Sequence, residues 1–206
     1  TKRLENQKAW VAALPVADMV NFGWISQAKE FRDKLLNCFN FFGVSSLEEW
    51  QQNYGKVVAE TAFRTSDRFS HKTESVTAWL RQGQLISESI PTEAWNSIKL
   101  TETLPALREL SNIDKPAMFI PKLIKLLSQC GVALSIVRTP KNCPASGATY
   151  RINDSKALII LSFRYLTDDH FWFRDFGKPA RSLMNLFNII FQHGFRGVKI
   201  GNHPVF

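Results

Sequence analysis

The spacing of apolar residues divides the chain into a helical first part and a second part with the period of strands. Between residues 26 and 131, apolar side chains recur three and four positions apart, which places them on one face of a helix. We interpret these faces as protein core rather than as ligand sites. The first predicted helix runs from a cap at Ser26 to Gly43, with apolar positions between Phe31 and Phe42. Further helices are predicted around the apolar positions of Trp50–Val58, Trp79–Ile86 and Leu104–Leu110, and over Phe119–Cys130.

Capping residues set the predicted ends of these helices. Ser26 is the expected N-cap of the first helix, and Gly43 is expected to end it in a left-handed conformation. Ser46 and Glu49 have the spacing of a capping box, in which both side chains bond backbone N–H groups at the helix start. The other predicted boundaries are Ser75 and Pro91 for the third helix, Pro116 or Pro121 in the first turn of the last helix, and Gly131 at its end.

From Val132 the apolar residues form short runs typical of strands, at 132–137, 147–152 and 157–163. The turn at residues 153–156, with the sequence Asn-Asp-Ser-Lys, suits a hairpin between the second and third strands. We therefore predict an α+β fold, in which a helical N-terminal part precedes a small, mostly antiparallel three-stranded sheet packed against helices.

Composition favours a globular protein of the cytoplasm. Hydrophobic residues make up 45% of the 206 residues and charged residues 21%, which is ordinary globular usage. No run approaches the roughly 20 apolar residues of a membrane span, and the polar N-terminus lacks a signal-peptide core. The three cysteines are odd in number and form no Cys-x-x-Cys pair, so we expect a reducing compartment and no disulfide framework; they are Cys38, Cys130 and Cys143.

The third predicted strand leads into an Arg-Tyr-x-x-Asp-Asp-His-Phe-Trp-Phe box at residues 164–173. Three aromatic segments precede this box along the chain, at residues 9–16, 22–25 and 41–50. Together they resemble the ImmA/IrrE group of zinc metallopeptidase-like domains, in the version found in bacterial helix-turn-helix (XRE/HigA-like) regulators and antitoxin relatives. The resemblance covers about residues 8 to 173. It implies that the strand at Ser146–Thr149 borders a cleft for an extended peptide.

In that family a His-Glu-x-x-His helix follows the box directly. Counted without gaps, the first histidine falls on Gly177, the glutamate on Lys178 and the second histidine on Arg181. Zinc peptidase chemistry needs two imidazoles on one helix face and a carboxylate that deprotonates the bound water. Glycine has no side chain, and two cations repel a divalent metal. Pro179 also interrupts the helix that would hold the site.

The histidines elsewhere in the chain do not replace this motif. No two of them are four residues apart, as a helical zinc pair requires; they are His71, His170, His193 and His203. We therefore predict no catalytic, metal-binding or cofactor-binding residues, no cofactor and no enzymatic activity. An active zinc metallopeptidase with ligands that the motif does not reveal remains the alternative.

The tail from Arg174 to Phe206 differs in character from the rest of the chain. Five basic residues and one acid give it a net charge of +4, out of +8 for the whole chain. We expect its apolar center, Leu183–Phe191, to form a packed helix, with contacts to nucleic acid phosphates as the alternative. The two histidines, the glutamate and an uninterrupted helix are all lost together at this point. A reading-frame change or gene fusion near codon 174 explains this better than a gradual loss of the catalytic residues by mutation.

The predicted organisation has three parts. Residues 1–60 form a helical connector, which in the family usually follows a helix-turn-helix domain that is absent here. Residues 61–173 form the peptidase-like α+β domain, and 174–206 the divergent basic tail. The predicted function is a non-catalytic regulatory or antitoxin-type module of a bacterial transcriptional regulator. The expected partner is a protein, either a toxin or a second copy in a homodimer, with no membrane contact. DNA contact is expected through the upstream domain, or alternatively through the basic tail.

Overall fold

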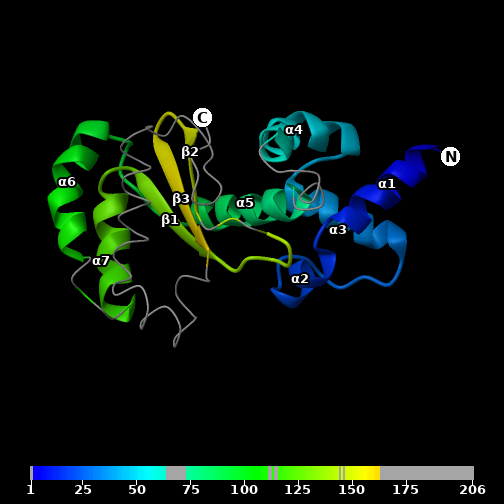
Figure 1. Ribbon diagram of the computed structural model, residues 1–206, viewed down its shortest axis with the longest axis horizontal. Helices are drawn as coiled ribbons and strands as arrows, with labels where there is room; N and C mark the ends of the chain where they lie inside the picture. Colours follow the sequence, from blue (N-terminus) through cyan, green and yellow to red (C-terminus); the bar gives the residue numbers. More distant parts are fainter. Residues whose placement is uncertain are drawn as a thin grey trace. The chain divides into compact units, whose positions relative to one another are not determined.

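The computed structural model describes residues 2–63, 73–110, 113, 116–143, 145 and 147–162. The described residues belong to two compact units. Unit 1 takes them from Thr1–Gln82 and Arg138–Pro144, and unit 2 takes those of Gly83–Val137 and from Ala145 onward. The predicted boundaries at residues 60 and 173 stay predictions. The elements are α1 Lys2–Ala13, α2 Val16–Asn21, α3 Phe31–Phe42, α4 Leu47–Phe63, α5 Thr73–Glu88, α6 Ser97–Glu109, α7 Pro116–Ser128, β1 Val132–Val137, β2 Gly147–Asn153 and β3 Lys156–Ser162 (Figure 1).

Unit 1 is a set of helices around a cluster of aromatic rings. Trp10 of α1 stacks on Phe39 of α3 with ring centroids 5.2 Å apart, and it meets Trp50 of α4 edge-on at 5.5 Å. Phe42 contacts Trp50 and Tyr54 in T-shaped pairs. Such pairs stabilise by about 0.5–1.5 kcal/mol each beyond the area that they bury. Ring contacts therefore link α1, α3 and α4.

The helix ends in unit 1 confirm two of the predicted boundaries and correct two. Ser75, predicted to start the third helix, lies inside α5, which begins at Thr73. Gly43 adopts φ 67° and ψ 38°, and the N–H groups of Gly43 and Val44 bond back to Asn40 and Phe39, as in a Schellman motif. The Ser26 cap is wrong, because α3 begins only at Phe31 and its N-cap position is Glu30, which makes no side-chain bond there. The carbonyl of Ser26 instead accepts a 2.9 Å hydrogen bond from the Asn37 side chain.

The predicted capping box at the start of α4 forms with one change of partner. The Ser46 hydroxyl accepts the backbone N–H of Glu49 at 3.2 Å, as expected. The Glu49 carboxylate reaches one residue further back and accepts the backbone N–H of Ser45 at 2.7 Å and its hydroxyl at 2.8 Å. These bonds lower the pKa of Glu49, because they favour its ionised form.

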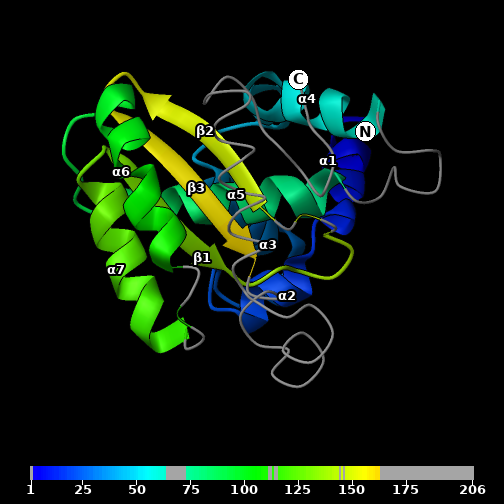
Figure 2. The same cartoon turned by 60° about the vertical axis from the view of Figure 1, so that its left-hand side comes forward.

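The sheet of unit 2 differs from the predicted one. It has about four strands rather than three, and it is mixed rather than mostly antiparallel. Among the described residues the order is β1–β3–β2; β3 forms the predicted antiparallel hairpin with β2 but pairs parallel with β1. The connection at residues 138–146 is too long for a tight hairpin. Because β2 does not fold straight back on β1, β3 can lie between them (Figure 2).

Helices cover the central strands of this sheet. Leucines of α6 and α7 pack with β1 and β3 in a largely aliphatic core, and α6 and α7 lie side by side along the sheet (Figures 1 and 2). The last turns of α5 are also close to the sheet, since a Cβ on Gly83 would lie 2.4 Å from Cδ1 of Ile160. The buried hydroxyl of Ser135 on β1 donates to the Gly83 carbonyl at 2.9 Å. Burial on both faces explains the continuous apolar runs of β1 and β3.

The helix boundaries of unit 2 also follow from local chemistry. Pro116 opens α7 as one of the two predicted prolines, while Pro121 lies inside the helix. Asn96 caps α6, since its side chain accepts the N–H of Lys99 at 2.9 Å. This cap was not predicted from the sequence. Gly131 follows α7 with φ 79°, as predicted for the end of that helix.

Candidate functional site

The residues at the predicted peptidase motif lie outside the described part of the chain. This holds for Gly177, Lys178 and Arg181, and for all four histidines. The loss of zinc chemistry therefore remains a prediction from the sequence. Within the described residues, no group of three or more cysteine, aspartate and glutamate side chains is close enough together to hold a metal ion.

The three cysteines lie inside the protein as free thiols. Burial raises the pKa of Cys38 to about 11, although the nearby Lys34 ammonium acts in the opposite direction. The thiol is the form present at neutral pH, and a thiol is a poor nucleophile and a poor metal ligand. The sulfur of Cys130 lies 3.4 Å from the hydroxyl of Thr103 and donates toward a helix carbonyl. Cys38 and Cys130 are thus parts of the core rather than of a reactive site.

β2 is the first candidate surface for a partner. It pairs with β3 on one side, and no other described strand pairs with its other side. Three of the four residues of the predicted peptide-binding strand, Gly147 to Thr149, lie on β2, while Ser146 is outside the described residues. The side chains of Ala148 and Thr149 are buried, so β2 is anchored to unit 2, and β2 is the last strand on its side of the described sheet (Figure 2).

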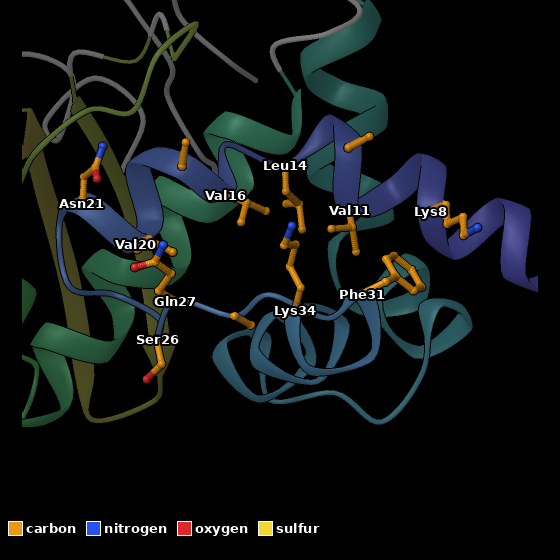
Figure 3. A pocket seen from close by; sticks show the side chains of 13 residues that line it. Lys8, Val11, Leu14, Val16, Val20, Asn21, Ser26, Gln27, Phe31 and Lys34 are labelled. Atoms are coloured by element: carbon orange, nitrogen blue, oxygen red, sulfur yellow. The ribbon is translucent and has the colours of Figure 1, made fainter.

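A groove in unit 1 is the second candidate. It has a volume of about 630 Å³ and lies among α1, α2, the segment that follows α2, and α3 (Figure 3). Its apolar lining comes from Val11, Leu14, Val16, Val20 and Phe31, with the amides of Asn21 and Gln27 at one end.

The chain builds this groove by a sharp change of direction after α1. Leu14 and Pro15 separate α1 from α2, and the N–H of Val16 bonds to the carbonyl of Leu14 at 2.8 Å. The segment after α2 is held against α3 by the bond from Asn37 to the carbonyl of Ser26. The same bond that replaces the predicted Ser26 cap therefore fixes one wall of the groove.

The charges of the groove have one sign. Lys8 and Lys34 line it, and no aspartate or glutamate does. The Lys8 ammonium lies 5.9 Å from the center of the Phe31 ring. Lys34 is half-buried, and its side chain rises from α3 toward Leu14 (Figure 3). From the sequence, this region is predicted only as an aromatic connector, because a groove depends on the relative orientation of three helices and produces no periodic pattern of residues.

Comparisons with protein-family models, with curated proteins and with solved structures found no match. Among the described residues, none of the helices combines the length and the apolar character needed to cross a membrane.

Proposed function

We propose that the chain is a non-catalytic regulatory or antitoxin-type module that acts through protein contacts. The resemblance of residues 8–173 to the ImmA/IrrE group supports the regulatory assignment, and the residues at the motif positions support the loss of catalysis. Gly177, Lys178 and Arg181 offer no ligand for zinc and no general base. We place this activity in the cytoplasm on the grounds of the cysteine pattern.

The single structural observation that carries the proposal is that, among the described strands, β2 pairs only with β3. A strand whose second edge is available can accept an extended segment of a partner by strand addition. The backbone supplies the hydrogen bonds, each worth about 0.5–1.5 kcal/mol net, and the side chains select the partner. Such binding needs neither metal nor base, so it persists where hydrolysis is lost.

Hydrogen exchange on the intact chain tests this proposal. The chain is mixed with the protein encoded beside it, or concentrated alone for self-association, and light scattering reports the mass of the complex. We expect amides of Gly147–Asn153 to exchange at least about tenfold more slowly in the complex. The amides of α6 provide the internal control and are expected to keep their rates. A chain that stays monomeric with either candidate, or a complex that leaves β2 unprotected, contradicts the proposal.

A further inference from the structure

The groove of unit 1 has the volume of a small-molecule site and a lining that is more apolar than polar, and it is open on one side. Its volume of about 630 Å³ lies within the roughly 300–1,000 Å³ of typical ligand pockets. Val11, Val16 and Val20 line it with aliphatic surface. The hydrogen bond between Asn37 and Ser26 holds one wall in place without help from a ligand. The site is therefore largely formed within the chain itself.

Lys34 makes this groove more favourable for a negatively charged ligand than for a neutral one. Its half-buried side chain lies beside Leu14 (Figure 3), and among the described residues no carboxylate forms an ion pair with it. A cation that is partly removed from water is favoured by an anionic partner. Lys8 adds a second positive charge to the lining. A ligand that pairs with these ammonium groups and also covers the apolar lining must therefore carry a negative charge as well as an apolar body.

We propose that this groove binds an amphiphile of the fatty-acid class, with its carboxylate near Lys34 and its alkyl chain on the aliphatic lining. Inorganic anions would leave the apolar surface exposed to water, and neutral hydrocarbons would leave the ammonium without a partner. A partner helix needs apolar positions along several turns, whereas the volume of this groove is that of a small ligand. The inference does not depend on the proposed regulatory function, since it concerns binding to unit 1 alone.

Titration of the full chain with laurate, compared with dodecanol of the same chain length, separates the contribution of the carboxylate from that of the alkyl chain. We expect laurate to bind at one site below its micelle concentration, at least about tenfold more tightly than dodecanol. From octanoate to laurate, each added methylene is expected to tighten binding up to about fourfold. Equal affinities for the acid and the alcohol, or no binding of either, would overturn the proposal.

Charge variants separate a role of Lys34 from a general effect of positive charge. Lys34→Gln is expected to weaken laurate about tenfold and to leave dodecanol unchanged. The matched control is Lys29→Gln, which removes an exposed lysine that does not line the groove and is expected to keep the laurate affinity. Circular dichroism checks that both variants fold. Equal losses in the two variants would show that the chain attracts the anion only through its overall charge.

Amide chemical shifts locate the bound ligand. We expect laurate to shift the signals of Val11, Val16, Ala28 and their neighbours and to leave β1 unchanged. A second copy of the chain is the competing occupant of the groove. If dilution of the chain without ligand shifts the same signals, the groove is a self-association surface and the proposal is wrong. Ligand shifts confined to unit 2 would overturn it as well.

Discussion

The cores of the two units are built from different kinds of side chain. Among the described residues, unit 1 contains a connected set of contacting aromatic ring pairs. The core cluster of unit 2 is mostly leucine, valine, isoleucine and alanine, with Cys130 and one phenylalanine, Phe119, and with the partly buried Trp95 packed against it. In unit 1, rings from α1, α3 and α4 pack against one another between the helices. The strands of unit 2 present a regular surface, which aliphatic side chains and close-approaching glycines cover.

This difference has a functional consequence. In unit 1, the turn between α1 and α2 leaves a groove among α1, α2 and α3, with Lys8 and Lys34 in its lining. In unit 2, the candidate surface is instead the backbone edge of β2. Unit 1 would thus recognise a ligand through side chains, whereas unit 2 would recognise a partner protein through the backbone of β2.

Loss of a ring from unit 1 should have the largest effect. Trp10 is buried and contacts three rings, so Trp10→Ala should destabilise the fold by about 3–5 kcal/mol in denaturant melts. Trp10→Phe is the control. The indole N–H has no partner among the described residues, so phenylalanine keeps a ring and should cost less than about 1.5 kcal/mol. Equal losses for the two variants would contradict the role of the ring.

Close backbone packing in unit 2 predicts the next effect. Gly131 has φ 79°, and a Cβ there would lie 2.3 Å from the backbone of Trp95. Gly131→Ala should therefore cost about 2–4 kcal/mol, from left-handed strain together with overpacking. Gly23→Ala separates the two contributions, because Gly23 has φ 74° but nothing within 4 Å, so only the strain of about 1–2 kcal/mol remains. Similar urea midpoints for the two variants would show that the contact with Trp95 costs nothing.

The smallest effect concerns the acid side of the pH profile. The pKa of Glu49 is lowered by its bonds to Ser45, so the ionised carboxylate stabilises the folded state. This contribution is complete above the ordinary glutamate pKa of about 4.3 and disappears as pH falls through the lower folded-state pKa. Glu49→Gln should flatten the loss of stability in that window, measured by thermal melts from neutral to acid pH. An unchanged acid slope would show that the carboxylate contributes nothing.

The sequence predicted those parts of the fold that depend on local chemistry. Gly43, Ser46 and Gly131 act at helix ends because glycine tolerates positive φ and a serine hydroxyl accepts a nearby N–H. The parallel pairing of β1 with β3 was missed because strand runs carry no direction or order. The Ser26 cap was wrong because α3 begins only at Phe31, so the Ser26 hydroxyl is not at its N-terminus. The groove was missed because it depends on the turn at Pro15 and on helix orientation.

We propose that the chain derives from a peptidase-like domain that has lost its zinc chemistry. Elemental analysis of the purified full chain, combined with a peptidase assay before and after chelation, tests this claim most directly. With Gly177, Lys178 and Arg181 at the motif positions, we expect far less than one zinc per chain and no cleavage of peptide with or without added zinc. Near one zinc per chain, lost on chelation together with a proteolytic activity, would contradict the account.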